Sequence, residues 1–182
     1  MPVLKTSKKK WIKRLLAVAF IIFIAGFLIP QNFTMPVKGA TSKSYSQNSF
    51  WFYPWGKSVT HKGVDIFAKR GTEVHPATGG LVIFSGKLGR GGNAVMVLGP
   101  KWRLHYYAHL DTINKGLFSF VTKNSIIGTV GSTGNAAGKP PHLHYTIKTL
   151  VPYIWRGDES VQGWKKMFYL NPVEYLNKST GR

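Results

Sequence analysis

Cysteine is absent from this chain of 182 residues, and acidic residues are scarce. Without cysteine the protein forms no disulfide bonds, and any zinc site must use other ligands. The absence is compatible with an oxidising compartment but does not demonstrate one. Only six Asp and Glu residues stand against 25 Lys and Arg residues, which gives a formal net charge of +19. This excess favours an anionic partner, such as nucleic acid, a membrane surface or an acidic polymer, although a role in solubility alone is equally open.

One long apolar run is present near the N-terminus, behind a group of basic residues. The run covers residues 15–29 and is followed by Pro30. It is shorter than the roughly 20 residues that span a bilayer. Trp11 and Ile12 extend it if the two basic side chains that follow them reach back to the headgroups. The basic residues of this region are Lys5, Lys8, Lys9, Lys10, Lys13 and Arg14.

This N-terminal segment could be a cleaved signal or a retained anchor. A small-x-small cleavage site directly after the run is missing, so we expect an uncleaved anchor. The positive-inside rule then holds the N-terminus in the cytoplasm and directs the chain after Pro30 outward. We expect residues 1–30 to form a cytoplasmic basic tail and transmembrane anchor, residues 31–49 a linker, and residues 50–182 the folded domain.

Short apolar segments separated by glycine dominate the chain after residue 60, a pattern typical of antiparallel β domains. We expect strands over residues 64–68, 81–84, 94–98, 102–110 and 125–130, and a hairpin turn at Gly89–Gly92. A short C-terminal helix is expected over Pro172–Leu176, with Asn171 as its N-cap. The sequence therefore predicts a mainly β fold. The aromatic segment Phe50–Trp55 is expected to pack at the core or domain edge, with a shelf for stacking substrate as the weaker alternative.

Two histidines, His142 and His144, are separated by one residue at the start of an alternating segment. In a strand, residues i and i+2 point to the same face, so both imidazoles would lie side by side. Such a pair is compatible with a metal site or with an acid/base pair. A metal site needs further ligands, and the earlier segment His61-Lys-Gly-Val-Asp65 offers an imidazole and a carboxylate.

Asp65 is predicted to lie in a strand among apolar residues, where an unpaired carboxylate is costly. A divalent cation would compensate its charge. Zinc accepts nitrogen from His and oxygen from Asp, and a catalytic zinc site has three protein ligands and an open position. His61, Asp65 and one histidine of the 142/144 pair would make that set. Alone, the 61–65 segment would be interpreted as a surface loop with a salt bridge.

Six motifs occur in order over about residues 61–147: His61-x-Gly63-x-Asp65, Gly71-Thr72, Gly80, Tyr107-Ala-His109-Leu110, Gly128-x-x-Gly131-x-Thr133-Gly134 and Pro141-His142-Leu-His144. Their order and spacing resemble the M23 (LytM/lysostaphin-type) zinc metallopeptidases. The resemblance implies a LytM-like antiparallel β-sheet domain (the duplicated hybrid motif), with Zn²⁺ bound by His61, Asp65 and His144. It also implies that His109 and His142 are the two further catalytic histidines.

The resemblance further implies a zinc endopeptidase that cuts peptide crosslinks of bacterial peptidoglycan. With the anchor, it would be a single-pass protein of the bacterial inner membrane whose catalytic domain faces the cell wall. We expect peptidoglycan and the membrane as partners, possible regulation by another protein, and no nucleic acid. Two alternatives stay open: a non-catalytic relative that binds peptidoglycan or activates another cell-wall hydrolase, and a membrane module that binds anions. Which crosslink is cut does not follow from the sequence.

In the mechanism that we expect, His142 is the general base, and later returns a proton to the leaving amine, while His109 and the metal stabilise the oxyanion. Strand parity predicts that His105, Tyr107 and His109 share one face, so His105 could reach the site, although a structural role is favoured. The chain departs from the family pattern in two places: Lys139 is an extra residue before the Pro-Pro-His motif, and Tyr145-Thr146 replaces the usual Phe-Glu.

Overall fold

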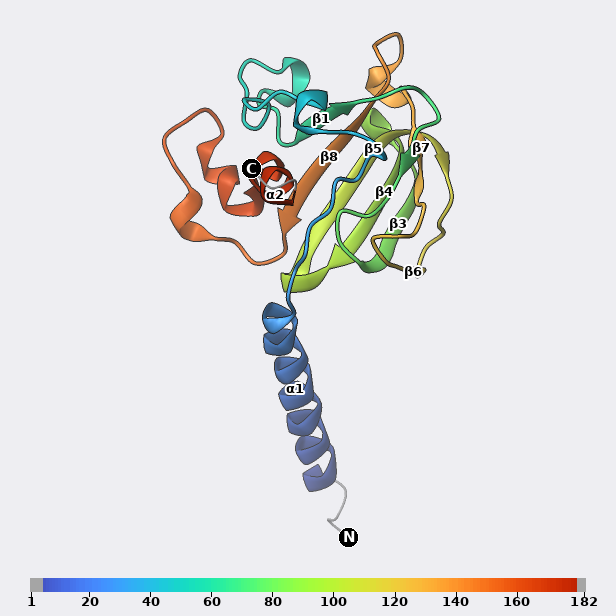
Figure 1. Cartoon of the computed structure of the whole chain (residues 1–182). Helices are drawn as coiled ribbons and strands as arrows, with labels where there is room; N and C mark the ends of the chain where they lie inside the picture. Colours follow the sequence, from blue (N-terminus) through green and yellow to red (C-terminus); the bar gives the residue numbers. More distant parts are fainter. Residues whose placement is uncertain (1–4, 180–182) are drawn as a thin grey trace.

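The computed structural model describes residues 5–179, so the first residues of the expected tail and residues 180–182 of the expected domain lie outside it. A 24-residue helix, α1 (Lys5–Leu28), projects from a β domain (Figure 1). Its Lys8–Leu28 part is long and apolar enough to cross a membrane. Its apolar side chains are exposed, with Leu16 and Ile21 each at 65%. A core helix would bury such side chains, so the domain does not explain this apolar run.

The domain is built around one antiparallel sheet in which the path of neighbouring strands is β1-β8-β5-β4-β3-β6. Strand β2 pairs with β7, which also pairs with β5, and β9 pairs with β8. The predicted mainly β fold and the Gly89–Gly92 connection between β3 and β4 are confirmed. The described strands are β1 (Val64–Phe67), β2 (Glu73–Val74), β3 (Gly80–Leu88), β4 (Gly92–Gly99), β5 (Arg103–Ile113), β6 (Phe120–Val121), β7 (Gly128–Val130), β8 (His142–Thr149) and β9 (Tyr169–Leu170).

The C-terminal helix is present as α2 (Pro172–Ser179) and is longer than predicted. Asn171 caps it, because its side-chain oxygen accepts a hydrogen bond from the Val173 amide at 3.1 Å. The helix buries Val173 and Leu176 against the sheet. This packing stabilises a helix that would be too short to form alone in water.

Alternation along the central strands divides the sheet into a core face and a site face. On β5 and β8, Tyr107 and Tyr145 point to the core face, are fully buried and stack with ring centroids 5.2 Å apart. Such pairs contribute about 0.5–1.5 kcal/mol beyond the burial of their area. Their neighbours Tyr106 and His144 point to the opposite face and line a cavity. The strands that form the core therefore also position the site.

Residues 31–49, expected as a linker, lie against the sheet. Thr34 donates its amide to the Ala77 carbonyl at 2.9 Å, and Val37 forms a β-bridge with Val74. Val37 and Tyr45 are only 1% and 5% exposed and belong to the hydrophobic core. These apolar residues fix a segment whose serines and threonines suggested a free tether. Where the folded unit begins stays a prediction.

A β-bulge interrupts β5 within the segment Tyr107-Ala-His109-Leu110. Tyr107 pairs with Val95 and Leu110 with Asn93, so two residues of β5 oppose one residue of β4. The backbone of His109 has a φ of +63°, a conformation uncommon outside glycine. The expectation that His109 shares a face with His105 and Tyr107 is wrong, because the extra residue turns His109 to the site face.

Candidate active site

Three side chains that are distant in the sequence meet at the edge of the site face. Asp65 of β1 lies directly opposite His144 of β8, and His61 precedes β1 by three residues. The Nδ1 atom of His144 lies 2.7 Å from Asp65 Oδ1, and His61 Nε2 lies 3.1 Å from the same oxygen. His61 Nε2 and His144 Nδ1 are 3.2 Å apart. All three potential ligand atoms lie within 4.8 Å of one another.

This spacing fits a tetrahedral zinc site. With bonds of about 2.0–2.1 Å, two ligand atoms of a tetrahedral zinc lie about 3.3 Å apart. Two of the three separations, 3.1 and 3.2 Å, are close to that value, and the 2.7 Å pair is shorter, as in a direct hydrogen bond. The donor set of two imidazoles and one carboxylate leaves one position of a tetrahedron for water or substrate. The structure thus brings together the three residues predicted as ligands.

A backbone carbonyl and a side-chain hydroxyl orient the two histidine ligands. The Ser49 carbonyl lies 2.9 Å from His61 Nδ1 and can only accept, so Nδ1 carries the hydrogen and Nε2 offers its lone pair to the site. For His144 to bind through Nδ1, its hydrogen must be on Nε2. The Thr146 hydroxyl oxygen lies 3.0 Å from that atom and can accept it. Sequence reasoning missed both roles, although Thr146 follows His144 by two residues and so shares its face.

Asp65 is held in its charged form. Burial alone would raise the pKa of this carboxyl, but the neighbouring His144 and His61 rings, which donate to Asp65 when these nitrogens carry a hydrogen, outweigh burial and lower its pKa far below the usual range. An ionised carboxylate between two imidazoles is the state that a divalent cation requires.

His109 and His142 lie beside this cluster, each with one nitrogen already engaged. The Nδ1 atom of His142 lies 2.8 Å from the Pro140 carbonyl, and that of His109 lies 2.9 Å from the Thr133 carbonyl. Carbonyl oxygens only accept, so in the neutral rings both Nε2 atoms hold a lone pair. His142 Nε2 lies 4.0 Å from Asp65 Oδ2. The ring centroids of His109 and His142 are 5.1 Å apart. Burial, with the nearby His144 and His142, lowers the pKa of His109 to about 4.

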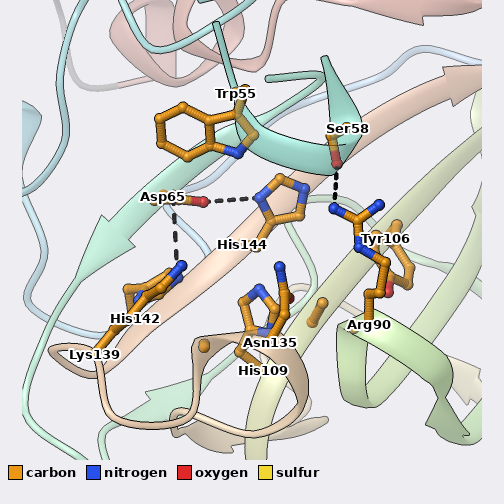
Figure 2. Close-up of a pocket in the computed structure, with 13 residues that line it drawn as sticks. Trp55, Ser58, Asp65, Arg90, Tyr106, His109, Asn135, Lys139, His142 and His144 are labelled. Atoms are coloured by element: carbon orange, nitrogen blue, oxygen red, sulfur yellow. Dashed lines mark hydrogen bonds and ion pairs between the residues drawn. The ribbon is translucent and has the colours of Figure 1, made fainter. Parts of the chain in front are cut away.

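A cavity of about 210 Å³ opens over these groups (Figure 2). Trp55 covers one side of it and lies against His61 with ring centroids 4.2 Å apart. Trp55, Phe52 and Tyr53 are 40%, 50% and 57% exposed, so of the two expected packing positions, core or domain edge, these three residues have the domain edge. Arg90, which donates to Ser58 Oγ at 3.0 Å, and Lys139 bring positive charge to the cavity wall. Sequence reasoning gave Arg90 and Tyr106 no role in the site.

The two remaining histidines lie elsewhere. His105 is fully buried on the core face, where its nitrogens contact the Tyr145 hydroxyl at 2.7 Å and the Gln31 amide nitrogen at 3.0 Å. These contacts support the structural role favoured from the sequence. His75 lies next to Glu73, with 3.3 Å between Nε2 and Oε2.

Comparisons with known proteins agree with this geometry. Residues 59–159 match the model of peptidase family M23. The chain is 40% identical over 88 residues to the DD-carboxypeptidase/endopeptidase Mpg of Neisseria meningitidis, an alignment that covers 48% of the chain and 20% of that protein. The chain thus spans about a fifth of the length of this curated relative.

Two solved structures share the fold. The catalytic domain of the antimicrobial peptidase lysostaphin from Staphylococcus simulans superposes with a TM-score of 0.59 at 26% identity, covering 75% of this chain and 95% of that one. A zinc-containing peptidase from Vibrio cholerae superposes with a TM-score of 0.52 at 27% identity, covering 64% and 36% of the two chains. The match to lysostaphin spans nearly all of a catalytic domain, so the β domain described here corresponds to that unit.

Proposed function

The chain belongs to peptidase family M23, and from that premise we propose that it is a zinc-dependent endopeptidase that hydrolyses peptide crosslinks of bacterial peptidoglycan. One observation carries the proposal: three ligand atoms from His61, Asp65 and His144 lie within 4.8 Å of one another, beside two histidines whose Nε2 atoms are available. A non-catalytic relative would have no need of a complete set of ligands and proton acceptors.

His61, Asp65 and His144 would hold the metal, with Ser49 and Thr146 fixing the orientation of the imidazoles. When bound, Zn²⁺ supplies Lewis-acid chemistry, which includes lowering the pKa of water to about 7. The absence of cysteine leaves nitrogen and oxygen donors only, and the short distances between them match zinc better than the larger oxygen cages of calcium.

His142 is suited to accept the proton of the attacking water. Its Nδ1 hydrogen is held by the Pro140 carbonyl, which leaves Nε2 as the acceptor beside Asp65. After proton transfer the ring is an imidazolium and can protonate the leaving amine. The Pro140 carbonyl favours this step because it stabilises the Nδ1 hydrogen throughout.

His109 has the same arrangement, and this refines the role expected for it. Its Nδ1 hydrogen is directed at the Thr133 carbonyl, so a neutral His109 presents a lone pair rather than a hydrogen at Nε2. A pKa of about 4 keeps the ring neutral before the reaction. His109 therefore donates to a developing oxyanion only after it has taken up a proton, and before that step it can orient the attacking water.

An extended peptide suits the surface around these groups. A second cavity of about 300 Å³ shares Trp55, Tyr106 and His144 with the first and continues to Lys148 and Tyr169. Together the two cavities form a continuous surface that passes the proposed ligands. Peptidoglycan stem peptides carry free carboxylates, and Arg90 and Lys139 on one side and Lys148 on the other offer cations to bind them.

We also propose that α1 anchors the protein in the inner membrane with the catalytic domain facing the cell wall. The length and composition of Lys8–Leu28 support a membrane span. The basic residues at the N-terminal end of this helix support an orientation with the N-terminus in the cytoplasm, and its exposed apolar side chains support contact with lipid.

The test is digestion of purified sacculi and of defined crosslinked muropeptides by the full chain in detergent, with zinc content measured on the same sample. We expect about one zinc per chain, release of muropeptides, loss of release with a chelator and recovery on adding zinc. The bond that is cut follows from the masses of the products. A protein that binds zinc and sacculi but releases nothing would establish the non-catalytic alternative and overturn the proposal.

A further inference from the structure

A separate polar cavity lies at the start of β5, on the core face and near α1, far along the strand from the proposed active site. The cavity has a volume of about 440 Å³ and lies between the end of α1, the start of β5 and helix α2. It contains three cationic residues, Lys101, Arg103 and Lys178, together with Gln31 and Tyr175. Among the salt bridges of residues 5–179, none includes any of these three cations.

Arg103 is built into this cavity rather than lying on the surface. It is only 8% exposed, its Nη1 donates to Gln31 Oε1 at 2.6 Å, and its guanidinium lies 5.2 Å from the ring centroid of Tyr175. Its Nε atom is buried and makes no hydrogen bond to the described residues. A buried guanidinium that has no carboxylate partner among the described residues is costly unless an anion compensates its charge. The cavity that it lines has room for one.

Contacts between Trp102 and α1 place this cavity beside the C-terminal end of the helix. The Trp102 indole nitrogen donates to the Phe23 carbonyl at 2.7 Å, and the two rings stack 6.1 Å apart. Gly26 lies under the same indole, so close that a Cβ there would be 2.4 Å from the ring. Tryptophan prefers the headgroup region of a bilayer. Figure 1 shows the end of α1 meeting the domain at this edge of the sheet.

We propose that this cavity binds the phosphate of an anionic phospholipid headgroup in the leaflet from which the domain emerges. The inference rests on the proposed membrane anchor but not on catalysis. Arg103 offers a planar set of donors that suits phosphate oxygens, and Lys101 and Lys178 add charge around it. The bound headgroup would compensate the buried guanidinium and hold the catalytic domain against the bilayer.

Exposed apolar side chains on the neighbouring loop support this orientation. Leu150 follows β8 and donates its amide to the Trp102 carbonyl at 3.1 Å, so this loop begins beside the residue that contacts α1. Leu150, Ile154 and Trp155 are 53%, 72% and 77% exposed. Apolar and aromatic side chains beside a basic cavity are the composition of surfaces that lie in the membrane interface.

The experiment is native mass spectrometry of the full chain in detergent, titrated with phosphatidylglycerol or with phosphatidylcholine. We expect the parent to retain phosphatidylglycerol more tightly. The double variant Lys101→Gln/Lys178→Gln should lose affinity for it by roughly fivefold per lysine, with little change for phosphatidylcholine. The matched control Lys43→Gln/Lys87→Gln removes two exposed lysines outside the cavity and should behave as the parent. Equal affinity for the two lipids, or equal losses in both double variants, would overturn the proposal.

Inorganic phosphate distinguishes a lipid from a free anion. If the headgroup is the ligand, millimolar phosphate should leave phosphatidylglycerol bound, since the lipid is also held by its acyl chains. Complete displacement would identify a free phosphate site and contradict the proposal. Arg103→Gln should weaken lipid binding further, and the lysine variants decide the question if this buried substitution prevents folding. Zinc content and cleavage of soluble muropeptides should be unchanged in the lysine variants, so a failure here is separable from a failure of the proposed function.

Discussion

Two polar clusters that contain histidine lie on opposite faces of the same two strands, β5 and β8, and they differ in how completely the histidine nitrogens are satisfied. On the core face, His105 donates to the Tyr145 hydroxyl, and its other nitrogen accepts from the Gln31 amide. The oxygen of that same amide accepts from Arg103. On the site face, His109 and His142 each bind one carbonyl and keep the other nitrogen available.

The difference shows how one sheet supports both packing and chemistry. A buried polar group with all its hydrogen-bond partners present stabilises a single arrangement. A polar group that lacks a hydrogen-bond partner is available for metal, water or substrate. His105 in the core-face cluster is fully buried beside Gln31 and Phe33, whereas the site-face cluster opens into the cavity beneath Trp55. Substitutions in the two clusters should therefore change different properties.

The largest effect is expected for His144→Ala. This change removes one of three proposed ligands, and the two that remain should not retain zinc. Zinc content should fall to background and muropeptide release to the level of the chelated parent. Elemental analysis and a sacculus digestion measure the two quantities. His75→Ala, which replaces a histidine outside the cavity, is the matched control and should keep both; normal turnover in the His144 variant would refute the ligand assignment.

A smaller loss is expected for His142→Ala and for His109→Ala. Neither residue belongs to the proposed ligand set, so both variants should keep their zinc. The turnover number should fall by about 10²–10⁴-fold, the usual contribution of a positioned proton-transfer group. Steady-state kinetics on a defined muropeptide, together with zinc analysis, separates this result from loss of metal. If His109→Ala contained no zinc, the role assigned to His109 would be wrong.

Thr146→Val tests whether the orienting hydroxyl matters. The variant keeps the size of the side chain but removes the acceptor 3.0 Å from His144 Nε2. We expect zinc affinity to fall by roughly 10–100-fold, as is usual for partners of metal-binding histidines. Competition with a chelator of known affinity measures the change. Thr112→Val, an exposed substitution on the same sheet, should leave the affinity unchanged.

The smallest effect should come from His105, and it should concern stability rather than activity. Burial, then the charge of Arg103, lowers the pKa of His105 to about 3. The folded protein therefore keeps this ring neutral while the unfolded chain takes up a proton below about pH 6.5. The contribution of the neutral His105 to the free energy of unfolding is complete above that pH. It is lost as pH falls from about 6.5 towards 3, and the free energy of unfolding decreases by up to roughly 1.4 kcal/mol per pH unit.

Denaturant titrations of the full chain in detergent at pH 5 and pH 7.5 measure this dependence. In His105→Gln the difference between the two free energies of unfolding should be smaller than in the parent, even though the variant is less stable at both pH values. Zinc content at neutral pH should not change. An unchanged pH dependence would show that His105 is not the neutral buried group described here.

Local spacing and the family resemblance predicted the part of the site that depends on strand alternation. His142 and His144 share a face because they are two apart, and Asp65 meets His144 because β1 and β8 pair in that register. The rotation of His109 could not be predicted, since the bulge depends on how β5 pairs with β4. Trp55 and Arg90 were missed for a similar reason: they reach the cavity through loops whose course is set by tertiary contacts.

The contacts that Gln31 makes with His105 and Arg103 have a consequence for how far from the membrane the proposed activity can act. Gln31 lies three residues after the end of α1, and Phe33 already packs against the His105 ring. With α1 as the proposed anchor, these contacts would hold the β domain at a fixed height above the bilayer. The proposed endopeptidase would then reach only peptidoglycan close to the membrane, and a flexible insert before Gln31 should extend its reach to more distant layers.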